Sequence, residues 1–256
     1  MKRNQHQIDD GLNNRLASLR RILSAQAECS DSELVRTELR RRLQQPALTA
    51  VCRRLDRFER LNSRPRLSQR SDILLLLLYL KDRLGRAATG ICGITRIQKL
   101  LFLASHELGC QTAISKPYRF QPYRLGPFSA EVYDDIEGLA QAGIICRQNI
   151  DPSGMPVIQL DAGIAAGIRG LNHNLAEIER LNTLSTQISL TARGERFARA
   201  LAESARRKNP ALLPALQALK AVWADRPLAE LLTYVYKRYP GFTTESEILD
   251  RLLKQD

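Results

Sequence analysis

The sequence predicts a mainly α-helical protein with a winged-helix-like core and a small β-hairpin wing. Three observations support this. Apolar residues recur at spacings of three and four along most of the 256 residues. Two short β-like segments, residues 144–150 and 188–190, interrupt that helical pattern. Between residues 71 and 205 the expected order is helix, short strand, helix, helix and hairpin, which is the order of a winged helix.

Residues 1–65 are expected to form a basic module of three helices. Leucines three and four residues apart predict the first helix over residues 8–27, and the second ends at Pro46. The third runs to about Leu61, and residues 62–69 are typical of a linker. Residues 1–70 hold 16 Lys and Arg against 8 Asp and Glu, and so carry most of the net charge of +12.

Such a basic end can bind nucleic acid, bind an acidic partner protein, or serve solubility through internal pairing with nearby carboxylates. Arginines on outward helix faces could follow a phosphate backbone without reading bases. The candidates for nucleic-acid contact are Arg40, Arg41, Arg53, Arg54 and Arg57.

The winged-helix-like domain is expected over residues 71–205. Ser71 would cap a buried helix that contains the run ILLLLLYL, and a strand could follow at residues 90–94. Thr95 and Gln98 fit a capping box at the start of the next helix. Ser129 would cap a later helix and Gly143 would end it.

The wing is expected to begin with the strand at residues 144–150. The sequence DPSG is a turn signal, residues 157–160 could return as a strand, and a helical excursion would span residues 162–184. Residues 188–190 then resume a strand, and Thr191 caps the following helix. Residues 206–256 are expected to form helices that pack on this domain.

Two segments carry a family resemblance. The sequences QKLLFLASHELG, at residues 98–109, and YRFQPYRLGPFSAEVYDDIEGLAQAGII, at residues 118–145, resemble the SocA-like Panacea domain. The tail LLTYVYKRYPGFTTESEI also resembles the end of such proteins, so the resemblance covers about residues 71–250. It implies a helical, winged-helix-like domain that works by protein contact, often as the antitoxin of a toxin pair.

The aromatic segment before Ser129 and the helix after it are the candidate partner-binding region. In a helix-turn-helix protein, the second helix would enter the major groove. Here that helix, residues 129–145, has four carboxylates and neither Lys nor Arg, so a phosphate lattice would repel it. Base stacking, a structural role and protein contact all remain open for the aromatic rings. The candidate partner-binding residues are Tyr118, Phe120, Tyr123, Arg124, Phe128, Asp134 and Asp135.

Catalysis is poorly supported by the sequence. The three histidines, His6, His106 and His173, are far apart and lack metal-ligand spacing. The five cysteines form no C-x-x-C pair, and there is no phosphate-binding glycine motif. We therefore expect a non-enzymatic protein without a cofactor or a metal site.

A cytoplasmic location is expected, because no apolar run follows the positive charges of the N-terminus. The expected partner is another protein, such as a toxin or effector, with DNA or RNA possible at the basic N-terminus and no membrane contact. A DNA-binding transcriptional regulator that grips phosphates with the N-terminal helices is the alternative hypothesis.

Overall fold

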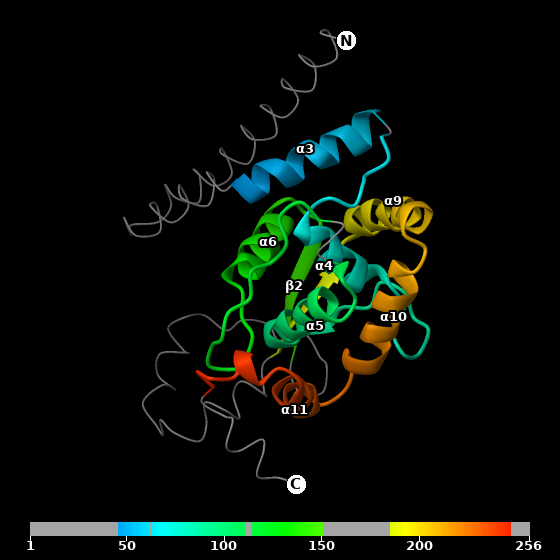
Figure 1. Cartoon of the computed structure of the whole chain (residues 1–256). Coiled ribbons are helices and arrows are strands. Elements are labelled where there is room, and N and C mark those ends of the chain that lie inside the picture. Colours follow the sequence, from blue (N-terminus) through cyan, green and yellow to red (C-terminus); the bar gives the residue numbers. More distant parts are fainter. Residues whose placement is uncertain (1–45, 62, 111–113, 151–184, 247–256) are drawn as a thin grey trace, which may run out of the picture.

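The structure, a computed structural model, describes residues 46–61, 63–110, 114–150 and 185–246 (Figure 1). Within these residues it is mainly α, with seven α-helices and a three-stranded antiparallel sheet. The first two predicted helices, the return strand at residues 157–160 and the excursion at residues 162–184 lie outside the described residues. No helix in the described part of the chain is both long and apolar enough to cross a membrane.

Helix α4 (Arg70–Tyr79) is the centre of the molecule. Every side chain from Ser71 to Leu78 is buried, because α5, α9, α10 and the sheet pack around it. A helix that is apolar all round is stable only when neighbours cover it on every side. Its N-cap is Gln69, which forms a capping box with Asp72, so the prediction of a Ser71 cap was wrong by two residues.

The helices around α4 follow the predicted order. They are α5 (Ile94–His106), α6 (Ala130–Gln141), α9 (Ala192–Lys208), α10 (Leu212–Trp223) and α11 (Leu228–Arg238), with a short 3-10 helix, η2, at Pro240–Phe242. The N-cap of α5 is Gly93 rather than Thr95, and Gln98 bonds elsewhere, so the predicted capping box was wrong. The predicted cap of α9 is confirmed, since the Thr191 hydroxyl accepts a hydrogen bond from the Gly194 amide.

The sheet contains β1 (Ile91–Cys92), β2 (Ile145–Ile150) and β3 (Ser185–Leu190), in the order β1-β3-β2. Strand β3 pairs antiparallel with both neighbours, so Ile188 lies opposite Ile91 on one side and Arg147 on the other. The predicted strands at residues 144–150 and 188–190 are therefore confirmed.

Helix α3 (Pro46–Leu61) lies across α6 and beside α9, as the blue helix in Figure 1. Cys52 and Leu55 belong to the same hydrophobic cluster as α4, α5 and α9. The Arg193 side chain of α9 also forms a bidentate ion pair with Glu59. Although the sequence placed it in an N-terminal module, α3 shares its core with the residues that follow it.

A buried lysine joins α10 to the end of α4. The Lys220 ammonium donates hydrogen bonds to the carbonyl oxygens of Leu78, Leu80 and Thr89, at 3.2, 2.7 and 3.1 Å. The Leu78 and Leu80 carbonyls lie at the C-terminal end of α4, where a positive charge is favourable, and the Thr89 carbonyl belongs to the loop before β1. Burial nevertheless lowers the pKa of Lys220 to about 8.

Candidate binding surfaces

A tight turn organises the aromatic segment. Gln121 and Phe128 pair as an isolated antiparallel bridge, with both backbone hydrogen bonds at 2.9 Å. Between them Gly126 has φ 82°, a backbone region that favours glycine. A Cβ atom there would also lie 2.7 Å from the Tyr236 ring, so the turn and α11 can approach only because residue 126 is a glycine.

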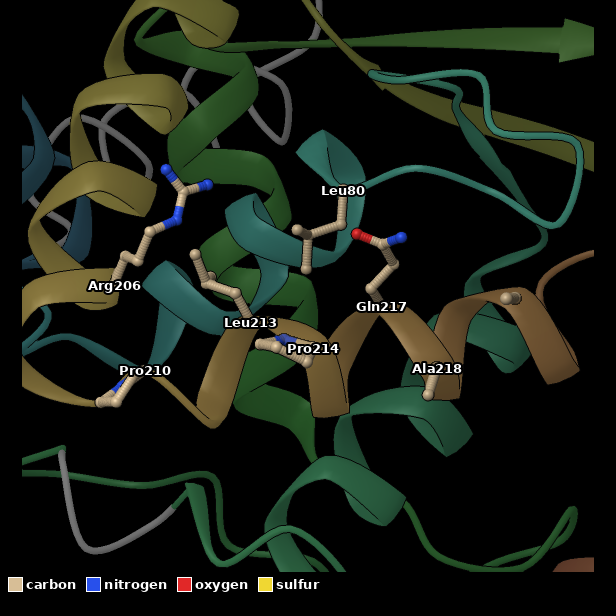
Figure 2. A pocket seen from close by; sticks show the side chains of 8 residues that line it. Leu80, Arg206, Pro210, Leu213, Pro214, Gln217 and Ala218 are labelled. Atoms are coloured by element: carbon tan, nitrogen blue, oxygen red, sulfur yellow. The ribbon is translucent and has the colours of Figure 1, made fainter.

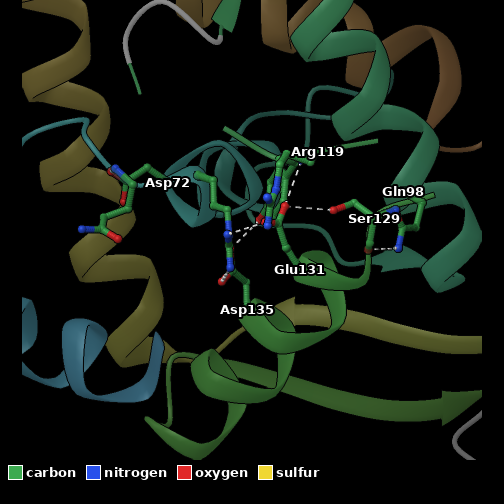
Figure 3. Close-up of polar contacts among 9 residues, drawn as sticks. Asp72, Gln98, Arg119, Ser129, Glu131 and Asp135 are labelled. Carbon is green, nitrogen blue, oxygen red and sulfur yellow. Dashed lines mark hydrogen bonds and ion pairs between the residues drawn. The ribbon is translucent and has the colours of Figure 1, made fainter. Parts of the chain in front are cut away.

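Helix α5 holds this turn from inside. The Gln98 side chain exchanges two hydrogen bonds with the Ser129 backbone, at 2.8 and 3.0 Å (Figure 3). The adjacent Lys99 ammonium donates to the Pro127 carbonyl at 2.8 Å and is 2% exposed. Burial lowers the pKa of Lys99 to about 7. These roles could not be predicted from the sequence, because an adjacent Gln and Lys on a helix are usually solvent-exposed.

The aromatic side chains of the segment divide into two groups. Tyr118 is buried, and Phe120 packs edge-on against Phe102 of α5 with ring centroids 5.3 Å apart. A second group, which we call the aromatic ladder, consists of Tyr123, Phe128 and Tyr133. Its successive ring centroids are 4.8 and 5.9 Å apart.

The aromatic ladder faces solvent. Tyr123 is 42% exposed and Tyr133 is 45% exposed, with Phe128 half-buried between them. The Arg124 guanidinium lies over the Tyr123 ring at 5.9 Å. Tyr133, the ladder's contribution from α6, was not among the predicted partner-binding residues. Its position at the edge of the apolar stripe of α6, about 100° around the helix from Val132, is the sequence signal that could have found it.

Asp135, one of the predicted partner-binding acids, is buried, and both of its carboxylate oxygens form hydrogen bonds within the protein. Arg70 donates to both of its carboxylate oxygens, at 3.0 and 3.2 Å, and the Tyr118 hydroxyl donates to it at 2.9 Å. Burial raises the pKa of Asp135 above its ordinary value, against the effect of these donors. Burial also raises the pKa of Tyr118, and the Asp135 charge adds to that shift. Tyr118 and Asp135 therefore position the loop and do not contact solvent.

Arginines from neighbouring segments also neutralise most of the remaining negative charge of α6. Glu131 accepts hydrogen bonds from the backbone and guanidinium of Arg119, at 2.9 and 3.1 Å (Figure 3), and lies 3.3 Å from Arg70. Glu137 forms an ion pair with Arg147 of β2 at 3.0 Å. Asp134 is exposed. The apparent acidity of this helix in the sequence is thus largely compensated in the fold.

The predicted nucleic-acid residues differ in their availability. Arg53 and Arg57 are exposed on α3, whereas Arg40 and Arg41 lie outside the described residues. Arg54 is committed to Asp72, with guanidinium-to-carboxylate distances of 2.6 and 3.1 Å.

A cationic groove runs between the C-terminal ends of α3 and α9 and the segment that joins α3 to α4. Its volume is about 880 Å3. The exposed cations that line it are Arg57, Arg64, Arg66, Arg207 and Lys208. Of these five cations, only Arg57 was predicted to contact nucleic acid, because the other four lie in a linker and in a helix far along the chain.

A second, smaller groove follows α10 (Figure 2). Leu80, Leu213, Pro214 and Ala218 are among the residues that line its volume of about 570 Å3. Arg206 and Gln217 provide its polar edges. These side chains do not form a nucleophile–base pair, so this groove has no arrangement that indicates catalysis.

The described residues show no group of three or more His, Cys, Asp or Glu side chains that could hold a metal ion. His106, the one described histidine, bonds through Nδ1 to the Phe102 carbonyl at 3.0 Å and stacks against the Phe102 ring. His106 is exposed and lies at the edge of the aromatic cluster that Phe102 forms with Tyr239 and Phe242.

Comparison with protein-family models, with curated proteins and with solved structures finds no match. The resemblance to the SocA-like Panacea domain therefore stays a prediction from the sequence.

Proposed function

We propose that this protein is a non-enzymatic interaction protein with a winged-helix-like core that binds a partner protein through the aromatic ladder. The order α4, β1, α5, α6, β2, β3, with β3 between the other two strands, supports the winged-helix assignment. The segment between β2 and β3 lies outside the described residues.

The single observation that carries this proposal is the exposure of a preformed aromatic cluster. Clustered exposed aromatic rings on a soluble protein mark interaction sites, and Tyr and Arg are enriched among the residues that dominate binding energy. The ladder is fixed by Gly126, by the bridge at Gln121 and by the bonds from Gln98 and Lys99. Binding would therefore require little ordering of the surface, which favours affinity.

The resemblance to Panacea antitoxins suggests the kind of partner, a toxin or effector protein held by direct contact. Arg124 and the exposed Asp134 would provide polar contacts at the edge of the ladder. Tyr118, Phe120 and Asp135 would act indirectly, since they are buried or half-buried supports of the loop.

Replacement of the two exposed rings tests this proposal. Tyr123→Ala combined with Tyr133→Ala should abolish a stoichiometric protein complex when the tagged full chain is purified from its native cells. Leu84→Ala combined with Tyr234→Ala is the matched control, because Leu84 and Tyr234 are also exposed apolar residues and lie outside the ladder. The proposal is wrong if both double variants retain the same co-purifying protein at wild-type yield.

A second candidate function, a DNA-binding regulator, is favoured by the exposed Arg53 and Arg57 on α3. Helix α6 lacks Lys and Arg, so this regulator would use its winged helix as a scaffold and would grip phosphates with the basic N-terminal helices. Deleting residues 1–65 would not test it cleanly, because α3 contributes Cys52 and Leu55 to the core. Arg53→Gln with Arg57→Gln should instead weaken duplex DNA binding, and unchanged affinity would rule out α3 as the contact.

A further inference from the structure

The cationic groove differs from the charged surface around α6, and from the Arg193 side chain, in lacking carboxylate partners for its exposed cations within the described residues. Arg70, Arg119, Arg147 and Arg193 each form an ion pair with a carboxylate. The five exposed cations of the groove form no ion pair within the described part of the chain, and no Asp or Glu is among the residues that line it. Concentrating like charges in this way raises the electrostatic free energy of the folded state, so the groove calls for a functional explanation.

The wall of the groove is ordered by specific bonds. The Arg54 guanidinium, bound to Asp72, also donates to the Arg66 carbonyl at 2.9 Å. The Asp72 carboxylate in turn accepts hydrogen bonds from the amides of Ser68 and Gln69, at 2.8 and 2.9 Å. Arg54 and Asp72 therefore neutralise each other while they fix the segment that carries Arg64 and Arg66. The groove is preorganised, and its exposed charges remain available to a ligand.

Helix dipoles explain only part of this charge. Arg207 and Lys208 lie in the last turn of α9, where basic residues commonly balance the negative end of the dipole. Arg64 and Arg66 lie outside any helix, so this explanation does not reach them. Their convergence with the end of α9, about 140 residues further along the chain, is a property of the tertiary fold.

We propose that this groove binds the sugar–phosphate backbone of a nucleic-acid strand. Four of its five exposed cations are arginines, whose planar guanidinium groups match the geometry of phosphate oxygens. Ser63, Ser68 and Ser204 add hydroxyl groups to the lining, and hydroxyls are frequent partners of phosphates in such interfaces.

An acidic protein is a poorer fit to the same groove. Protein interfaces depend on buried apolar or aromatic anchors, and Pro65 is the one apolar residue that lines the groove. Backbone contacts carry no base information, so binding here is independent of sequence. This proposal does not depend on the aromatic ladder, which lies on a different part of the chain and offers a different chemistry.

Neutralising the groove tests the proposal in the full chain. The groove variant combines Arg64→Gln, Arg66→Gln, Arg207→Gln and Lys208→Gln. A control variant removes the same number of exposed charges elsewhere, through Lys81→Gln, Arg83→Gln, Lys116→Gln and Arg238→Gln. Fluorescence anisotropy would measure the binding of a labelled 25-base-pair duplex and of a labelled 25-nucleotide single strand of mixed sequence, from 50 to 200 mM salt.

For the wild type, affinity should fall steeply as salt rises. The groove variant should bind at least about tenfold more weakly than the control variant at 50 mM salt. In a plot of log binding constant against log salt concentration, each lost phosphate contact makes the slope shallower by about 0.9 for a duplex or about 0.7 for a single strand. The two probes therefore distinguish binding of a duplex from binding of a single strand. Thermal midpoints of both variants equal to that of the wild type would show that folding is unaffected.

Three outcomes would overturn the proposal. The first is the absence of wild-type binding to either probe. The second is equal affinity and equal salt slope for the groove and control variants. The third is competition by poly-glutamate as effective as that by unlabelled nucleic acid, which would assign the groove to an acidic protein.

Discussion

Helix α6 and the cationic groove show opposite relations between charge in the sequence and charge on the surface. The sequence of α6 is strongly acidic, but Arg70, Arg119 and Arg147 approach it from other segments and neutralise most of it. The groove collects cations from α3, a linker and α9 and brings no carboxylate to its lining. Local composition therefore identifies a charged interface only when the fold leaves that charge uncompensated.

The largest predicted difference between the two regions is in the loss of stability when one arginine of each is replaced by alanine. Arg70→Ala should lower the free energy of unfolding by about 3 kcal/mol, because it leaves the buried Asp135 without its cation. Arg64→Ala, at an exposed position in the groove, should change it by less than about 0.5 kcal/mol. Urea unfolding of the two variants measures this difference, and equal losses of stability would break the contrast between the two regions.

The buried Lys99 beneath the aromatic turn predicts a smaller, pH-dependent effect. Its pKa is lowered to about 7 from 10.5, so the folded protein holds fewer protons than the unfolded chain between those values. The free energy of unfolding should therefore rise as pH rises through this window. Lys99 should account for about 3 kcal/mol of the rise between pH 7 and 9.5.

Urea unfolding at pH 7, 8, 9 and 9.5 would check this pH dependence. Lys99→Met should flatten the curve relative to the wild type. Lys208→Met, at an exposed lysine of the groove, should preserve the wild-type slope. A Lys99→Met curve parallel to that of the wild type would show that Lys99 titrates as a solvated group.

Replacement of Asp134 is predicted to have the smallest effect on stability. It therefore tests partner binding without a change in folding. Its side chain is exposed beside buried Asp135, so Asp134→Lys should change the free energy of unfolding by less than about 0.5 kcal/mol. If Asp134 contacts the partner at the edge of the ladder, the same variant should weaken that complex about tenfold, as for a lost charged contact. Pull-down titration measures the affinity, and an unchanged value would remove Asp134 from the proposed interface.

Local signals in the sequence predicted much of the fold. The Thr191 cap, the Ser129 position before α6 and the strand patterns at residues 144–150 and 188–190 all depend on neighbouring residues, and all appear in the structure. The misplaced caps of α4 and α5 arose because Ser71 and Thr95 are good capping residues that the fold uses inside the first turns.

The binding surfaces were less predictable, because they depend on contacts between distant segments. Asp135 looked like a surface acid until Arg70, 65 residues earlier, was found against it. Arg64 and Arg66 looked like ordinary linker residues until the fold placed them opposite Arg207. A single sequence carries no periodicity or spacing that would indicate that Asp135 lies against Arg70, or that Arg64 and Arg66 lie near Arg207.

Mapping where nucleic acid touches the protein tests the contrast between the two regions most directly. A strand containing 4-thiothymidine would be cross-linked to the wild-type chain, and the modified peptides would be identified by mass spectrometry. We expect cross-links in residues 57–69 and 204–208, and none in α6. Cross-links concentrated in α6, with none in the groove segments, would contradict the account.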